Sequence, residues 1–424
     1  MTDLGYWVTA AALVCSAVST LLYAGAVRTR ALVRRPRVFL ALGAGAVAAA
    51  SVLLVVLILS HDFSNGYVFS HSSRSLPLHY LLSSFYAGQE GSFLFWALAS
   101  AAISLVLLGN ARRRGVEAPV MAVYAAAQTL LLLLLVVKSP FRSVWEMFPD
   151  AIPSQVPADG WGLNPLLQNF WMVIHPPVLF VGFASMAVPF SFALAGLWKR
   201  DTSLLAAKGF SWVLLATLVL GIGIMLGAYW AYGVLGWGGY WGWDPVENSS
   251  LVPWLTGIAM LHTMAAQRKT GGFAWTNHLL ATASFFLVIY STFLTRSGIL
   301  GKASQHAFAD PSAGVYGLLL VYLLLIAGAG AWLMILRRKD LSAAAIGTHL
   351  VSRESVLGAG GLALVLIAVV VLAGTSLPIF SESAVEPAFY DATTLPLAVA
   401  LGLLIGLSLL TQWGAQPAAG VLRR

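Results

Sequence analysis

Charged residues are scarce in this sequence. They make up 9% of its 424 residues, whereas soluble domains contain roughly 25%. Hydrophobic residues make up 59%, and the mean hydropathy is +0.83. This composition excludes an ordinary soluble domain and predicts a membrane protein. The net charge of +8 does not by itself indicate nucleic-acid binding, because surplus Lys and Arg in a membrane chain usually belong to its cytoplasmic loops.

Cysteine is nearly absent as well. Cys15 is the only one, and it lies in the first apolar stretch. The chain therefore has neither an internal disulfide nor a CxxC dithiol pair, and any thiol chemistry must use the cysteines of a partner. The residues before this stretch lack the basic region of a cleaved signal peptide and include Asp3 instead. We therefore expect the first apolar stretch to remain in the mature protein.

Long apolar runs are abundant. Eleven stretches without Lys, Arg, Asp or Glu are long enough to cross about 30 Å of hydrocarbon. The absence of ionisable groups inside them makes a proton-coupled transporter less probable. We predict an all-α polytopic membrane protein that forms a single domain over residues 1–424, with about eleven transmembrane helices near 5–27, 38–60, 92–109, 119–137, 177–198, 209–230, 250–267, 273–295, 314–336, 356–377 and 393–413.

The basic residues divide unequally between the two sides that alternating spans define. One side holds 19 of the 24 Lys and Arg residues, and the other holds 12 of the 16 acidic residues. The positive-inside rule then predicts an outer N-terminus and an inner C-terminus. The long connections fall on the outer side, where we expect the function, because sites lie on loops that a rigid scaffold holds. These connections are 61–91, 138–176, 231–249, 296–313 and 378–392.

The most unusual segment is an outward tryptophan-rich loop at 230–254, which begins WAYGVLGWGGYWGWDPVEN. An isolated Trp here would be assigned to the interfacial aromatic belt, but this density needs another explanation. Glycine lets the backbone approach a flat ligand closely, and the aromatic faces supply rigid apolar contact. The segment therefore suits a planar macrocycle. Asp244, Pro245 and Glu247 also match the N-cap, N1 and N3 positions of a helix.

The segment WGGYWGWDPVENSSLVPWL resembles the tryptophan-rich-loop, haem-handling family of cytochrome c maturation, the CcmF haem lyases. Four further stretches carry the resemblance, which extends over essentially the whole chain: LNPLLQNFWMVIHPPVLFVGF at 163–183, WAYGVLGWG at 230–238, TFLTRSGILGKASQHAFADP at 292–311 and SRES at 352–355. The family pattern has Trp at the position of Tyr240 and commonly a bulky residue at Gly242. The aromatic surface is nevertheless preserved.

The resemblance implies a set of haem-binding residues. A transient haem substrate would lie against the loop, with His175 and His306 as ligands of its iron, while His262 would bind a stable, noncovalent haem b. The loop residues are Trp237, Gly238, Gly239, Tyr240, Trp241, Trp243 and Asp244. From the residues alone, His175 could equally cap a helix that starts at Pro176, and His262 could make an interhelical hydrogen bond. No general acid or base is assigned.

The resemblance also implies a function. The chain would be a haem lyase subunit of the bacterial inner membrane, and it would hold haem at the periplasmic face for thioether attachment to the CxxCH motif of apocytochrome c. Its partners would be a haem chaperone, a thiol-reducing, apocytochrome-binding maturation subunit and apocytochrome c, but no nucleic acid. Family members usually continue with further helices, an outer domain and another haem-ligating histidine, so we expect that part to be missing or separately encoded. A haem transporter or exporter and a noncatalytic haem-binding scaffold are the alternatives.

Overall fold

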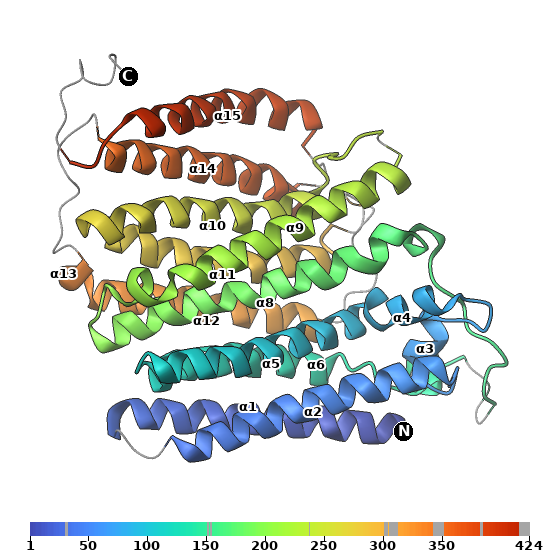
Figure 1. The fold of residues 1–424 in the computed structure, drawn as a ribbon. Helices are drawn as coiled ribbons and strands as arrows, with labels where there is room; N and C mark the ends of the chain where they lie inside the picture. Colours follow the sequence, from blue (N-terminus) through green and yellow to red (C-terminus); the bar gives the residue numbers. More distant parts are fainter. Residues whose placement is uncertain are drawn as a thin grey trace. The chain divides into compact units, whose positions relative to one another are not determined.

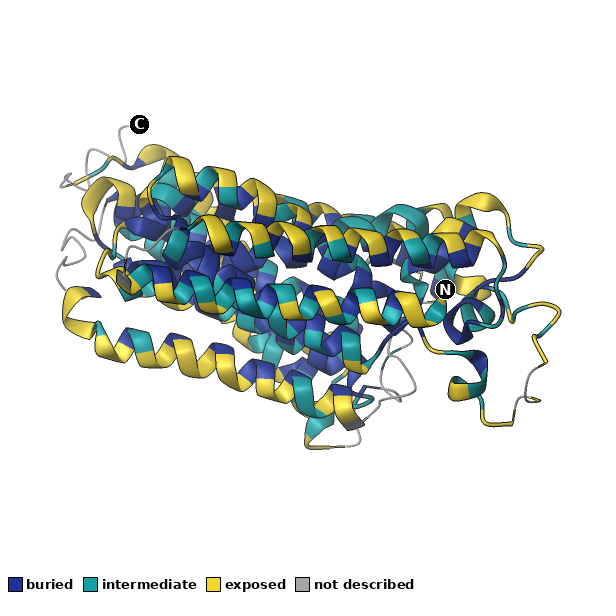
Figure 2. Ribbon diagram, turned by 90° about the horizontal axis from the view of Figure 1, so that it is seen from below, coloured by how far each residue is buried: buried dark blue, intermediate teal, exposed yellow. Residues whose placement is uncertain are grey.

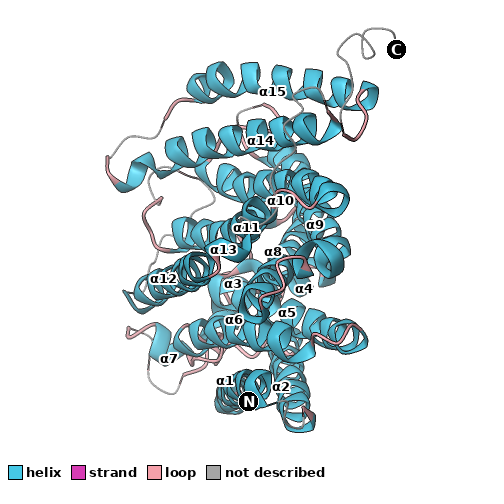
Figure 3. Ribbon diagram, turned by 90° about the vertical axis from the view of Figure 1, so that its left-hand side faces the viewer, coloured by secondary structure: helices cyan, strands magenta, loops and turns pink. Residues whose placement is uncertain are grey.

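The computed structural model describes residues 1–29, 33–150, 152, 155–236, 238–300, 304, 313–341, 352–381 and 385–414. In these residues the regular structure is helical (Figures 1 and 3), and extended pairing is limited to one isolated bridge between Asn65 and Ser143. The predicted all-α class is confirmed.

Eleven long helices correspond to the eleven predicted spans. Within the described residues, ten helices are long and apolar enough to cross a membrane, so the chain is a multi-pass membrane protein. The remaining long helix, α10, is less apolar because it carries Ser, His and Gln side chains. The long helices are α1 (Thr2–Thr29), α2 (Arg34–Leu59), α5 (Gln89–Arg113), α6 (Glu117–Val137), α8 (Phe170–Lys199), α9 (Phe210–Val234), α10 (Pro245–Thr270), α11 (Ala274–Arg296), α12 (Ala313–Leu336), α14 (Arg353–Ser376) and α15 (Pro387–Leu410).

The chain divides into two compact units. Unit 1 comprises Met1–Ser185 and Val219–Tyr240, and unit 2 comprises Met186–Leu218 and Trp241–Arg424. Helices α8 and α9 are each divided between the two units. In unit 1, α1 packs against α2 and α6, and α5 packs against α6. In unit 2, α10 packs against α11 and α14, and α15 packs against α14.

Exposed and buried residues alternate along the long helices (Figure 2), as expected for helices that face both neighbours and lipid. Helix α15 has the smallest buried share among the ten candidate spans, since only 6% of the residues in its most apolar stretch are buried. Leu395, Leu403 and Leu409 are among its exposed side chains. Exposed apolar faces of this kind are compatible with a hydrocarbon environment.

The connections predicted as long outer loops contain short helices. The first carries α3 (Gly66–His71) and α4 (Leu78–Ala87), and the second carries α7 (Val144–Met147) and the 3-10 turn η1 (Pro165–Leu167). The two connections are hydrogen-bonded to each other, because the Trp161 amide donates to the Phe69 carbonyl at 2.8 Å and the Gly162 amide to the Ser72 carbonyl at 3.1 Å. They form a folded end to unit 1.

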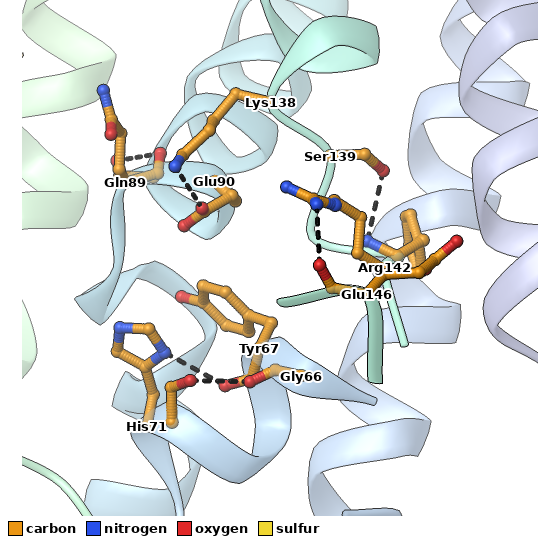
Figure 4. A network of polar contacts seen from close by, with 12 residues as sticks. Gly66, Tyr67, His71, Gln89, Glu90, Lys138, Ser139, Arg142 and Glu146 are labelled. Atoms are coloured by element: carbon orange, nitrogen blue, oxygen red, sulfur yellow. Dashed lines mark hydrogen bonds and ion pairs between the residues drawn. The ribbon is translucent and has the colours of Figure 1, made fainter. Parts of the chain in front are cut away.

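Two ion pairs fix helix ends within unit 1. Arg37 donates to both carboxylate oxygens of Glu117, from Nε at 2.7 Å and from Nη2 at 2.6 Å. At the opposite end of α6, Lys138 Nζ lies 3.4 Å from Glu90 Oε1 (Figure 4). Each pair joins two residues that the charge distribution assigned to the same side. The orientation of the chain stays a prediction.

Candidate functional site

The irregular part of the tryptophan-rich segment is shorter than the predicted 230–254. Helix α9 ends at Val234 and α10 begins at Pro245, so Trp230 and Trp254 belong to helices. Each of these two indoles donates to a backbone carbonyl within its own unit, Trp230 Nε1 to Leu166 and Trp254 Nε1 to Thr217, both at 3.1 Å. The site proper is therefore the connection between the helices. Trp237 lies outside the described residues.

The predicted helix start at Asp244 is confirmed. The Asp244 side chain accepts from the Val246 amide at 2.8 Å and, with Glu247, forms a capping box, while Pro245 stands at the first helical position. Glu247 also accepts from the Gly242 amide at 2.9 Å. These bonds satisfy amide groups that the first turn of a helix leaves open. They fix the last loop residues to the rigid start of α10.

Asp244 also connects the loop to the segment that carries His306. The Ser304 hydroxyl donates to Asp244 Oδ1 at 2.8 Å. This bond was not predicted, although the resemblance implied that His306, in the TFLTRSGILGKASQHAFADP stretch, and the loop bind the same haem. Ser304 precedes His306 by two positions, and His306 itself lies outside the described residues.

Trp243 is held by the first turn of α15. Its backbone adopts the left-handed region, with φ of 53°, which is unusual for a residue with a bulky side chain. The indole stacks on Tyr390 at a centroid distance of 5.0 Å, and its Nε1 donates to Asp391 Oδ1 at 2.8 Å. Asn248 Nδ2 donates to the Trp243 carbonyl at 3.0 Å. Tyr390 and Asp391 were not predicted from the sequence, because they are far from the loop in the chain.

The part of the loop that belongs to unit 1 presents an aromatic surface. Tyr240 stacks on Tyr232 at 4.4 Å with an interplanar angle of 13°, and it meets Tyr229 edge-on at 5.3 Å. Tyr229 stacks in turn on Trp171 at 5.0 Å. Tyr240 and Tyr232 are 50% and 53% exposed, so part of each ring stays accessible to a flat apolar ligand although the two rings stack on each other. Tyr240, the residue that departs from the family pattern, is part of this surface, while Gly238, with φ of 70°, supplies a left-handed turn.

His175 lies inside a helix, which corrects the prediction that it stands outside the spans, directly before a helix start at Pro176. Helix α8 begins at Phe170. The imidazole lies beside α9: Nδ1 is 2.7 Å from the Gly223 carbonyl, and a Cβ atom at Gly227 would come within 2.6 Å of His175 Cε1. Gly223 and Gly227 are therefore positions at which α9 packs closely against α8. Gly223 also lies close to the α8 backbone, since its Cβ would be 2.8 Å from Leu179 Cα.

The hydrogen bond to Gly223 determines the chemistry of the His175 ring. A carbonyl accepts only, so Nδ1 carries a proton and donates it to the Gly223 carbonyl. A metal-ligating histidine commonly donates its other nitrogen to a carbonyl in this way. The hydrogen bond of His175 to the Gly223 carbonyl is therefore the kind that a metal-ligating histidine makes.

His262 and His278 share a local arrangement but differ in access. His262 Nδ1 bonds the Ile258 carbonyl at 2.8 Å, and its ring is half-buried. His278 Nδ1 bonds the Ala274 carbonyl at 2.8 Å, but that residue is fully buried. His262 is partly exposed, whereas His278 is not. Of the two rings, only that of His262 is therefore accessible enough to fit the predicted ligand of haem b.

A polar cluster that sequence analysis did not assign lies near the start of α5 (Figure 4). His71 stacks on Tyr67 at 4.4 Å, and its Nδ1 bonds the Tyr67 carbonyl at 3.0 Å. The Tyr67 hydroxyl accepts from the Gly88 amide at 3.0 Å. Burial lowers the pKa of His71, although the Tyr67 carbonyl and the charge of Glu90 act in the opposite direction. A neutral His71 therefore accompanies the Glu90–Lys138 ion pair.

Known proteins resemble this chain over most of its length. It is 37% identical over 375 residues to the cytochrome c-type biogenesis protein CcmF of Pseudomonas fluorescens, covering 86% of this chain and 55% of that protein. It is also 37% identical over 381 residues to the Escherichia coli (strain K12) protein of the same name, covering 87% of this chain and 57% of that protein. The chain thus spans just over half the length of these relatives.

A solved structure has the same fold. The match to a structure described as cytochrome c heme lyase CcmF has a TM-score of 0.78 and 29% sequence identity, and it covers 98% of this chain and 63% of that one. The profile of the cytochrome C assembly protein family matches residues 86–300, a range that contains His175, His262 and the tryptophan-rich connection. The chain therefore belongs to the cytochrome c assembly protein family.

Proposed function

We propose that this chain is the haem-holding part of a haem lyase in cytochrome c biogenesis. Haem is its substrate, and the thiols of an apocytochrome CxxCH motif are the nucleophiles. Each S–H group adds across one vinyl group and forms a C–S bond, so the reaction needs reduced thiols and a fixed vinyl edge. The chain offers no dithiol of its own, since Cys15 is its single cysteine. Its contribution is to orient the substrate and exclude competing reactions.

The observation that carries this proposal is the seat of His175. Its Nδ1–H donates to the Gly223 carbonyl and its ring lies against Gly227, and these two contacts fix the orientation of the imidazole. We assign His175 and His306 as the ligands of the transferred haem. Trp237, Gly238, Gly239, Tyr240, Trp241, Trp243 and Asp244 form the surface and the support of the macrocycle.

His262 is the proposed ligand of a second, resident haem b. Its bond to the Ile258 carbonyl holds the proton on Nδ1, and the half-buried ring suits a ligand within a mainly apolar helix. When bound, haem b supplies one-electron redox chemistry. Replacement of His262 by Ala should remove a noncovalent haem from the purified protein. Unchanged haem content and an unchanged absorption spectrum would overturn this assignment.

We propose that the protein lies in a bacterial inner membrane with the tryptophan-rich connection on the periplasmic side. A haem chaperone would deliver the substrate there, and a thiol-reducing, apocytochrome-binding subunit would present the reduced CxxCH segment.

The test is holocytochrome c formation by His175→Ala, His306→Ala and the double variant at matched membrane levels. Because both imidazoles would bind one iron, the first replacement should remove most activity and the second should add little. A pyridine haemochrome spectrum should show that the His262-bound haem is retained. Near-normal maturation in the double variant would eliminate the two-histidine site.

Two reconstitution experiments separate the rival functions. A noncatalytic scaffold would bind haem without accelerating thioether formation when haem, reduced apocytochrome and the purified complex are combined. A transporter would move haem across sealed vesicles in the absence of apocytochrome. The lyase proposal requires accelerated thioether formation that depends on His175.

A further inference from the structure

A cavity of about 480 Å³ lies at one end of unit 2, away from the tryptophan-rich connection. Its polar walls come from the turn after α8, from the last turn of α10 and from the short helix α13 (Arg338–Leu341). The polar lining residues are Thr202, Ser203, Gln267, Arg268 and Asp340. All of them stand where apolar helices end, which is the headgroup level of a membrane.

The cavity has a fixed polar wall. Gln267 Nε2 donates to the Thr202 carbonyl at 3.3 Å, while its Oε1 accepts from Asn277 Nδ2 at 2.7 Å. The Arg268 guanidinium lies over the Phe210 ring, with Cζ 4.7 Å from the centroid. A cation over an aromatic face is attracted by its quadrupole, so this contact restricts where the guanidinium points.

Two opposite charges line the cavity without neutralising each other. In the part of the chain that the structure describes, neither Arg268 nor Asp340 takes part in an ion pair. A further wall is the π-helical segment η2 (Leu205–Gly209), which contributes Ala206 and Ala207. Short π-helical segments are rare and frequently accompany functional sites. The cavity therefore combines a cationic group, an anionic group and an apolar wall.

We propose that this cavity binds the headgroup of a zwitterionic aminophospholipid, with the phosphate at Arg268 and the primary ammonium at Asp340. A guanidinium suits phosphate because it donates two parallel hydrogen bonds. Basic pockets between membrane helices on the cytoplasmic side bind lipid headgroups, and the basic-residue distribution assigns these helix ends to that side. The acyl chains would leave along Ala206 and Leu341. This site is independent of the haem-binding residues and goes beyond the proposed function.

The ammonium group provides the sharpest test of the proposal. Ethanolamine carries three N–H donors for the Asp340 carboxylate, whereas the trimethylammonium of choline carries none, and phosphatidylglycerol lacks the cation. Native mass spectrometry of the detergent-purified full chain would be titrated with phosphatidylethanolamine, phosphatidylcholine, phosphatidylglycerol or inorganic phosphate. Phosphatidylethanolamine should bind about tenfold more tightly than phosphatidylcholine, equivalent to one charge-assisted hydrogen bond. Equal binding of the two, or full displacement by equimolar inorganic phosphate, would overturn the proposal.

Substitutions then assign the two charges. Arg268→Gln should weaken binding of phosphatidylethanolamine and phosphatidylglycerol alike, by about tenfold. Asp340→Asn should remove the preference for phosphatidylethanolamine over phosphatidylcholine and leave phosphatidylglycerol binding intact. Lys269→Gln is the matched control, because Lys269 is adjacent and exposed but does not line the cavity. Wild-type selectivity in Asp340→Asn, or an equal loss in Lys269→Gln, would show that the cavity is not the headgroup site.

Discussion

The imidazole of His175 occupies the space that a side chain at Gly227 would fill. A Cβ atom there would lie 2.6 Å from Cε1, 2.9 Å from Nδ1 and 3.1 Å from Nε2 of the ring. Gly227 therefore helps to set the orientation of the His175 ring, even though glycine carries no reactive group. This contact also explains why a glycine belongs in the middle of an otherwise favourable helical sequence.

Gly227→Ala should displace the His175 ring. A misplacement of about 1 Å can lower the rate of an oriented reaction about 100-fold, so we expect a loss of holocytochrome c formation of that order. Gly233→Ala is the control, since Gly233 lies in the same helix with no atom within 4 Å of its Cβ position. The rate of His175 modification by diethylpyrocarbonate, followed by mass spectrometry, gives a readout that does not depend on activity. Equal modification rates in both variants would contradict the conclusion that Gly227 determines the position of the His175 ring.

Asp391→Leu should release Trp243. It removes the acceptor of a hydrogen bond to a charged group, which contributes about 1.5–3 kcal/mol. Hydrogen exchange at the start of α10 should become faster, whereas Asp391→Asn, which keeps an acceptor oxygen, should have a smaller effect. In a Trp243→Phe background the donor is already absent, so Asp391→Leu should add almost nothing. If Asp391→Leu accelerates hydrogen exchange equally in the wild-type and Trp243→Phe backgrounds, Asp391 does not act through its bond to Trp243.

Local sequence patterns predicted the helices well and the site only partly. Asp244, Pro245 and Glu247 follow a capping pattern that depends on near neighbours in the chain, and the structure has that cap. The Trp243–Asp391 bond spans 148 positions, so no local rule indicates it. His175 was placed outside a helix because Pro176 and Pro177 are typical of a helix start. Instead α8 begins earlier and contains both prolines, because packing outweighs their local preference.

Acidification should weaken the folded end of unit 1 through His71. Burial holds the pKa of His71 below its ordinary value, so the unfolded chain takes up a proton before the folded chain does. Stability therefore falls as pH drops below about 6.5, by up to about 1.4 kcal/mol per pH unit. Thermal unfolding between pH 7.5 and pH 5 should be less pH-dependent in His71→Gln. An unchanged pH dependence would show that His71 is not the group responsible.

Protonation of Asp159 should lower the stability of the fold only in stronger acid than the protonation of His71 does. It accepts from the Arg74 amide at 2.9 Å and from the Gly160 amide at 2.8 Å, and these bonds lower the pKa of its carboxyl group. Because the charged form is favoured in the folded chain, Asp159 contributes to folding stability above the ordinary carboxylate pKa, and this contribution is lost below it. Asp159 therefore does not change the pH dependence of stability in the range where His71 takes up its proton.

Cysteine labelling tests the predicted orientation. In a Cys15→Ser background, Gly239→Cys should react with an impermeant thiol reagent from the periplasmic side of intact cells, and Arg113→Cys should not. Arg113 is exposed at the end of α5; the nearby Gly115 is less suitable because its φ of 70° disfavours cysteine. Both positions should react after the membrane is permeabilised. Labelling of opposite sidedness would invert the assignment of every connection.

The two ion pairs of unit 1 also bear on how the chain enters the membrane during synthesis. Arg37 and Glu90 leave the ribosome first, and each meets its partner only on α6, which carries Glu117 in its first turn and ends next to Lys138. Both residues lie at helix ends, so their charges face water or lipid headgroups until α6 is made. The insertion of α6 then pairs both charges. We expect α1, α2 and α5 to be retained by the insertion machinery and released together with α6 as one unit.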